Sequence, residues 1–201
     1  MKYKLSCKSV EDLDVGKFLG GKKCNILYTD PPWNNFSYWS TLALKQTGEK
    51  LKPTNNDYIA TFLNNTAKAN LDGFFFLEMG VKVKREHIQK IFNGLYNFVE
   101  FDVFYKGGGK WLPSKIYVGS TKMDYMFRQD LSGLKCDGKV LPSMCVRSVK
   151  HKDSIVFDPF CGLGNTAKVA VENKLEFYGN EFNKSRLTRT KNHLERHYGE
   201  I

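Results

Sequence analysis

Short apolar runs separated by polar stretches organise the chain. Runs of this length, bounded by turn residues, predict buried β-strands, here at Asn25–Asp30, Gly73–Met79, Phe98–Tyr105, Asp124–Arg128, Ser154–Asp158 and Glu176–Asn180. Between several runs, apolar residues recur at helical spacing, on the faces Tyr58, Ile59, Phe62, Leu63 and Ile88, Ile91, Phe92, Leu95. Strands alternating with helices predict an α/β fold with a largely parallel, doubly wound sheet. We expect loops at Trp33–Asn56 and Lys106–Lys122.

Length and composition set the class of protein. A chain of 201 residues with 41% hydrophobic residues suits one α/β domain with a full core. No apolar run approaches the roughly 18 residues of a membrane span, and the first residues carry no apolar signal core. The five cysteines are scattered and never form a CxxC pair. We therefore expect no disulfide framework, no membrane partner and a reducing cytoplasm.

The charge balance is strongly basic. The formal net charge is +10 and the sequence pI is near 9.3. Such a charge attracts polyanions, of which nucleic acid is the commonest. A lysine-rich proteome that merely keeps its proteins in solution would give the same balance, so charge alone leaves the partner open.

The first motif is Tyr28-Thr29-Asp30-Pro31-Pro32-Trp33, at the end of a predicted buried strand. The strand delivers the Asp30 carboxylate to the sheet edge where ligands of open α/β sheets bind. The prolines lack N–H donors, so nearby carbonyls stay free to accept hydrogen bonds. Asp30 and a carbonyl around Pro31 could hold the two N–H bonds of an exocyclic amino group, while Trp33 stacks on a flipped base.

The second motif is Asp158-Pro159-Phe160-Cys161-Gly162-Leu163-Gly164-Asn165-Thr166, which follows another predicted strand and opens a helix. Glycines at such a turn let the backbone approach a ligand, and Asp158 could pair with a ligand ammonium. Glu181 ends the next strand, where ribose hydroxyls are usually held. The string GLGNTA also satisfies the dinucleotide pattern, so this segment alone fits an NAD-dependent oxidoreductase as well.

Together, the two motifs resemble the amino-methyltransferases of DNA adenine and cytosine, in the circularly permuted class called β. Its catalytic DPPY or DPPW motif comes first, and its DPFxGSGTT cofactor motif comes near the C-terminus. The resemblance implies a Rossmann-like methyltransferase fold with a mostly parallel seven-stranded sheet flanked by helices, and S-adenosyl-L-methionine as cofactor. It implies catalytic roles for Asp30, Pro31, Pro32 and Trp33. The implied cofactor-binding residues are Asp158, Pro159, Phe160, Gly162, Gly164, Asn165, Thr166 and Glu181.

The chain departs from this family at two places. Lys8 and Ser9 stand where many members carry a Gly-Asp that contacts the cofactor adenine. Only Gln129–Val140 remains where the family has its target recognition domain, before the helix expected in Leu141–Lys152. We therefore expect a single methyltransferase domain over residues 1–201. Target readout would then come from the loops 33–56 and 106–122, from a partner subunit or a second copy of the chain, or would hardly exist.

Several weaker sequence signals have more than one interpretation. Lys106, Lys110 and Trp111 flank a triple glycine and suit phosphate contact and base stacking, or simply a hairpin tip. A solvated helix docked by its leucines explains the basic segment Lys184–His197 fully, and nucleic-acid binding is the less favoured alternative. His193 and His197 have metal-ligand spacing without a third ligand nearby, so we expect no metal. Cys161 reads as a small packing residue.

The sequence thus predicts methylation of a nucleobase amino group, at N6 of adenine in DNA, because the family's cytosine members more often carry Ser at the place of Asp30. Three alternatives stay open: an RNA adenine-N6 methyltransferase, a non-catalytic nucleic-acid-binding subunit and an NAD-dependent oxidoreductase.

Overall fold

The computed structural model describes residues 2–32, 40–41, 44–45, 56–80, 83–107 and 109–198. In these ranges the strands are β1 (Tyr3–Ser6), β2 (Cys24–Thr29), β3 (Leu71–Gly80), β4 (Tyr96–Gly107), β5 (Lys110–Ser120), β6 (Lys135–Cys136), β7 (Ile155–Asp158) and β8 (Glu176–Asn180). The helices are α1 (Val15–Phe18), α3 (Asn56–Phe62), α4 (Arg85–Phe92), α5 (Val140–Val149), α6 (Asn165–Glu172) and α7 (Lys184–Tyr198). A π-helical turn (Leu63–Ala67) and a 3₁₀ turn (Lys68–Asn70) extend α3.

The described strands form one mixed sheet in the order β1-β8-β7-β2-β3-β5-β4-β6. From β1 to β3 all neighbours are parallel, whereas β5 is antiparallel to both β3 and β4. The α/β class and the mostly parallel sheet are therefore confirmed. The expected count of seven strands is wrong, because the short strand β6 adds to the outer edge of β4.

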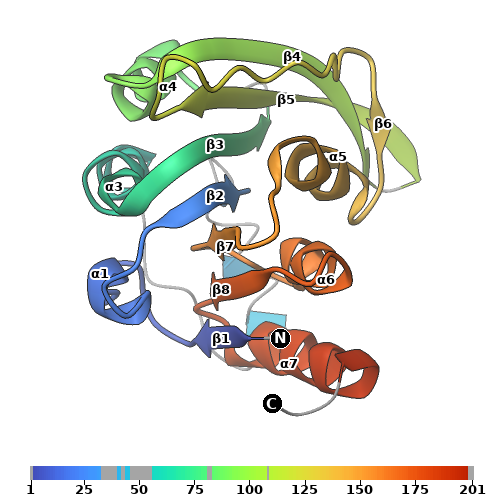
Figure 1. Ribbon diagram of the computed structural model, residues 1–201. Coiled ribbons are helices and arrows are strands. Elements are labelled where there is room, and N and C mark those ends of the chain that lie inside the picture. The colour runs from blue at the N-terminus through green and yellow to red at the C-terminus, as the bar shows by residue number, and fades with distance from the viewer. Residues whose placement is uncertain are drawn as a thin grey trace.

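Helices cover both faces of the sheet (Figure 1). Helices α1, α3 and α4 lie on one face, and α5, α6 and α7 lie on the other. Each face has its own apolar core: Phe75 and Phe157 belong to the first, Phe76 and Phe177 to the second. Strands buried on both faces explain the continuous apolar runs of the sequence. No helix among the described residues is long and apolar enough to span a membrane.

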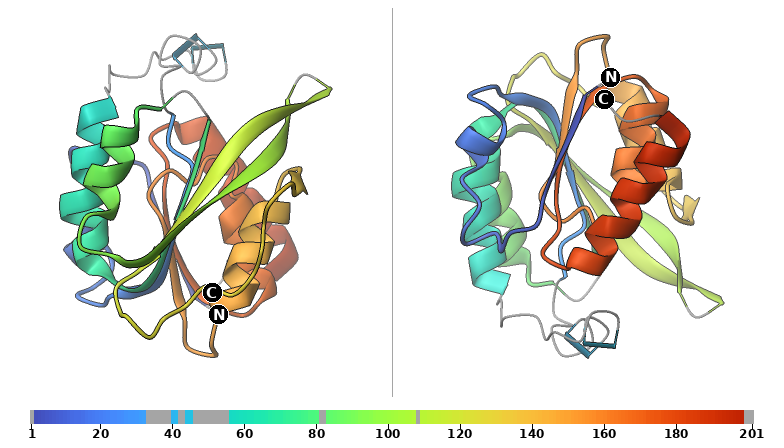
Figure 2. Two further views of the ribbon diagram at one scale, coloured as in Figure 1. Left: turned by 90° about the horizontal axis from the view of Figure 1, so that it is seen from above. Right: turned by 90° about the horizontal axis from the view of Figure 1, so that it is seen from below.

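Two local predictions are wrong. Asp124–Arg128 is not a strand; it makes no ladder, and the Asn97 amide instead donates to the carbonyls of Met123 and Tyr125. Most of the expected loop Lys106–Lys122 is strand β5, paired with β4 from Gly107↔Lys110 to Tyr96↔Ser120. The β4–β5 hairpin extends past the body of the molecule (Figure 2). The expected loop Trp33–Asn56 lies largely outside the described residues.

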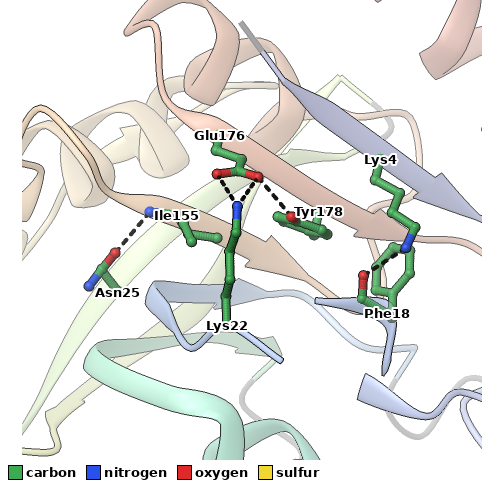
Figure 3. A network of polar contacts seen from close by, with 7 residues as sticks. All are labelled: Lys4, Phe18, Lys22, Asn25, Ile155, Glu176 and Tyr178. Atoms are coloured by element: carbon green, nitrogen blue, oxygen red, sulfur yellow. Dashed lines mark hydrogen bonds and ion pairs between the residues drawn. The ribbon is translucent and has the colours of Figure 1, made fainter. Parts of the chain in front are cut away.

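Polar contacts tie the sheet together at the amino ends of its strands (Figure 3). Lys22 Nζ lies 2.8 and 3.0 Å from the two oxygens of Glu176, the first residue of β8, and the Tyr178 hydroxyl donates to the same carboxylate at 2.7 Å. The Ile155 amide donates to Asn25 Oδ1 at 2.9 Å, which joins β7 to β2. This edge is occupied by structural contacts, which leaves the opposite, carboxyl edge for ligands.

Candidate functional site

The carboxyl ends of β2, β7 and β8 bring the two sequence motifs together. These strands are neighbours and parallel, so the residues that follow them meet at one edge. A cavity of about 350 Å³ opens there. The sequence-predicted residues among its lining are Asp30, Pro31, Pro32, Lys106, Asp158, Pro159, Phe160, Gly162, Asn165, Thr166 and Glu181. Gly164, Lys110 and Trp111 are not in the lining, and Trp33 lies outside the described residues.

Asp158 is a buried carboxylate at the end of β7, with 3% of its surface exposed. The Phe160 amide donates to its Oδ1 at 3.1 Å. Burial raises the pKa of Asp158 to about 7, although hydrogen bonds from Thr166 and the Phe160 amide oppose this rise. Within the described part of the chain, hydrogen bonds rather than a cation offset the charge of this group, so a positively charged ligand would fit beside it.

Glu181 is fixed by the backbone of the glycine turn. The Gly162 amide donates to its Oε2 at 3.0 Å, and the Asn183 amide donates to its Oε1 at 2.8 Å. Burial raises the pKa of Glu181, while the charge of Arg186 acts against it. The two backbone amides therefore fix the orientation of this carboxylate at the cavity.

The glycine turn has a conformation that other residues rarely adopt. Gly162 has φ of 54° and Gly164 has φ of 75°, both in the left-handed region. A Cβ on Gly164 would lie 2.4 Å from Thr190 Cγ2 of α7. Gly164 therefore allows the turn to pack closely on α7, rather than giving a ligand access to the backbone as the sequence suggested.

Asn180 links the beginning of the chain to the glycine turn. Its Oδ1 accepts from the Lys8 amide at 3.2 Å, and its Nδ2 donates to the carbonyls of Lys8 and Pro159 at 3.0 and 3.2 Å. Lys8 and Ser9 line the cavity. Asn180 was not predicted as a site residue.

Asp30 shares its part of the cavity with a second carboxylate, Glu78 at the end of β3. Although the Asp30 side chain is exposed to the cavity, the surrounding protein displaces enough water to raise its pKa well above the ordinary value. The charges of Glu78 and Asp158 add to this rise, and Arg186 opposes it. Glu78 accepts a hydrogen bond from the Tyr28 hydroxyl at 2.8 Å.

The cavity is lined by more carboxylates than its few cations can balance. Asp30, Glu78, Asp158 and Glu181 face it, together with Arg186 of α7. Where these carboxyls are ionised, the potential inside is negative and favours a cationic ligand over an anionic one. Sequence reasoning missed Glu78, which stands within an apolar run, and Arg186, which it read as one of several charges on a basic helix.

The β4–β5 hairpin carries the remaining predicted residues. Lys106 lies at the cavity and pairs with Asp137 at 3.8 Å. Trp111 is 41% exposed, and Lys135 Nζ lies 5.9 Å from its ring centroid. Lys110 is exposed at the turn. These side chains stand beside the cavity on an accessible hairpin.

Comparison of the fold with solved structures indicates the class of protein that this chain resembles. The chain has the α/β fold of solved DNA methyltransferases, with TM-scores from 0.57 to 0.66 over at least 95% of its length. One is a putative DNA modification methylase from Thermus thermophilus, with 16% identity and a TM-score of 0.66 over 100% of this chain and 97% of that one.

Two further matches share the fold. M1.HpyAVI in complex with SAM has 15% identity and a TM-score of 0.64, over 96% of this chain and 98% of that one. The cytosine-N4-specific PvuII DNA methyltransferase has 13% identity and a TM-score of 0.57, over 95% and 86%. The model of a family described as DNA methylase matches residues 135–192, from β6 into α7. No curated protein matches the chain by sequence.

Proposed function

We propose that this chain is an S-adenosyl-L-methionine-dependent methyltransferase that modifies the exocyclic amino group of a base in DNA. The observation that carries the proposal is that Asp30-Pro31-Pro32 and most of Asp158–Thr166, far apart in sequence, line one cavity. The DNA methylase match over residues 135–192 and the fold of DNA methyltransferases support it. The motif order favours the permuted class β, with one catalytic domain over residues 1–201.

The charge of the cavity fits this cofactor. S-adenosyl-L-methionine carries a sulfonium and an ammonium, and it supplies a methyl group on positively charged sulfur. Asp158 would pair with a cation and Glu181 would accept hydrogen bonds from ribose hydroxyls, while Asn165 and Thr166 stand at the N-terminus of α6. The diphosphate of NAD would instead add negative charge beside Asp30, Asp158 and Glu181, which argues against an oxidoreductase.

The chain would catalyse methyl transfer mainly by positioning the amino group of the base. An exocyclic amino nitrogen is a weak nucleophile because its lone pair is delocalised into the ring. Asp30 and the Pro31 carbonyl would accept hydrogen bonds from the two N–H groups and turn the nitrogen toward tetrahedral geometry. Trp33 would stack on the flipped base.

We propose adenine N6 as the target, because Asp stands at position 30 where the family's cytosine members more often carry Ser. DNA is preferred over RNA because the DNA methylase match includes the glycine turn Asp158–Thr166. Lys106, Lys110 and Trp111 would contact the nucleic acid beside the cavity. Since only Gln129–Val140 is available for target readout, a partner subunit or a second copy could complete it. A DNA substrate and the buried free thiols of Cys24, Cys136, Cys145 and Cys161 are in line with a reducing cytoplasm.

The test is to incubate the purified protein with isotopically labelled S-adenosyl-L-methionine and unmethylated DNA, with total RNA in parallel, and to identify the modified nucleoside. We expect N6-methyladenine in DNA, reduced about 10²–10³-fold by Asp30→Asn. Methylated cytosine would overturn the base, and label only in RNA would overturn the polymer. Melting curves with S-adenosylhomocysteine and with NAD identify the ligand. Cofactor binding with no label in either polymer would favour a non-catalytic subunit.

A further inference from the structure

Neighbouring strands bring two carboxylates side by side at the catalytic end of the cavity. In the parallel pair β2–β3, Tyr28 is opposite Phe76 and Thr29 is opposite Leu77. Asp30 directly follows Thr29 at the end of β2, and Glu78 follows Leu77 in β3, so the same register places Asp30 opposite Glu78. Because strand side chains alternate between faces, both return to the face of Tyr28 and Phe76, and both line the cavity.

A hydrogen bond from a buried tyrosine holds Glu78 in place and favours its ionised form. The hydroxyl that donates to Glu78 Oε2 at 2.8 Å belongs to Tyr28, which is 2% exposed and packed in the core. A hydrogen bond donated to a carboxylate favours its ionised form. The pKa of Glu78 is raised by burial, and the Tyr28 hydroxyl acts against this rise.

A negative charge on Glu78 disfavours the ionisation of Asp30, so the two carboxyls titrate as a pair. Burial and the charge of Glu78 both raise the pKa of Asp30, so the Glu78 charge makes Asp30 hold a proton more strongly. The other titratable groups around the pair come from β4, β6 and the turn after it, α5, β7 and α7: Tyr105, Lys106, Cys136, Asp137, Cys145, Asp158 and Arg186. Of these, Arg186 favours the ionised form of Asp30 and Asp158 disfavours it.

We propose that Glu78 is a positioning residue that acts through Asp30, making Asp30 a strong enough base to take the proton that the amino nitrogen releases on methylation. This inference rests on the proposed function. As the N–C bond forms, the S–C bond breaks and its electron pair stays on sulfur. The nitrogen then loses one N–H proton and keeps that electron pair. The proton goes to Asp30, is shared with Glu78 and leaves to solvent.

The first test does not depend on methyltransferase activity. In the ligand-free protein, the side-chain carboxyl ¹³C resonances are titrated, with Asp30 assigned by its absence in Asp30→Asn. We expect Glu78→Gln, which keeps the shape and removes the charge, to lower the midpoint of the Asp30 titration by about one pH unit or more. Glu78→Asp keeps the charge and should shift it less than half as far. An unmoved Asp30 titration in Glu78→Gln, or equal shifts in the two variants, would overturn the proposal.

The second test is the pH profile of methyl transfer. Asp30 must be ionised to accept the proton, so activity should fall as pH drops through the titration of the pair. Glu78→Gln should move this acidic limb to lower pH and reduce kcat on the plateau several-fold, with a smaller change in KM. A reduced kcat with an unmoved limb would mean a merely structural role and would refute the inference. If the unaltered protein methylates nothing, the proposed function fails, whereas the carbon titration still decides whether Glu78 controls the basicity of Asp30.

Discussion

The packing of the glycine turn on α7 can be tested at Gly164. An alanine there must keep φ near 75°, a left-handed conformation that costs about 1–2 kcal/mol for a residue with a Cβ. Its Cβ would also lie 2.4 Å from Thr190 Cγ2 and 2.8 Å from Thr190 Oγ1, so α7 must shift. Forcing a methyl group into a packed contact costs about 1–3 kcal/mol. We therefore expect Gly164→Ala to lower the free energy of unfolding by about 2–5 kcal/mol.

Gly21 provides a matched control. It has φ of 76°, and a Cβ placed there would meet nothing within 4 Å. Gly21→Ala should therefore show only the conformational cost of about 1–2 kcal/mol. Both variants are unfolded in urea, and the midpoints are compared at constant slope. Equal losses of stability would show that the contact with Thr190 is unimportant and would refute the packing argument. The double variant Gly164→Ala/Thr190→Ala should recover part of the loss.

Three further outcomes are expected. Because burial raises the pKa of Asp158 to about 7, the folded protein binds a proton there more tightly than the unfolded chain. The free energy of unfolding should fall as pH rises from about 4 to 7, and Asp158→Asn should flatten this slope in urea titrations. The pKa of Glu176 is lowered, because hydrogen bonds from Lys22 and Tyr178 outweigh partial burial. Glu176→Gln should thus cost about 0.5 kcal/mol at pH 7, and this difference should vanish as pH falls through the Glu176 pKa in thermal melts. If the hairpin contacts nucleic acid, Trp111→Ala should weaken binding to single-stranded DNA by about 1–3 kcal/mol, and Lys110→Ala should reduce the salt dependence by about one counterion, both by fluorescence titration.

The fold was predictable where burial alone decides it. The strand predicted at Glu176–Asn180 is β8, and those at Asn25–Asp30 and Ser154–Asp158 are β2 and β7 to within a residue. All three lie inside a sheet covered on both faces. Strand β5 was missed because a triple glycine and Pro113 resemble a loop, and its strand form depends on pairing with β4. Asp124–Arg128 has a strand-like composition, but β4 pairs with β6 instead.

The site was predictable where a motif sits at a strand end. Asp30 and Asp158 end predicted strands and Glu181 follows one, and parallel neighbours bring them to one edge. Glu78 could not be recognised, because only the register between β2 and β3 sets it beside Asp30. Asn180 could not be recognised either, since its partner Lys8 is 172 positions away.

The strand order has a consequence during synthesis. Strand β2 has β3 as one neighbour, made shortly after it, but its other neighbour is β7, and the Ile155 amide bonds to Asn25 across 130 positions. At about 5–20 residues per second, that edge of β2 stays open for roughly 6–26 s in every newly made chain. An open edge of apolar strand is a template for pairing with other chains. The pairing of β7 that brings Asp158 to the cavity also closes this edge, so a translation product truncated before β7 would lack the site and keep an open strand edge.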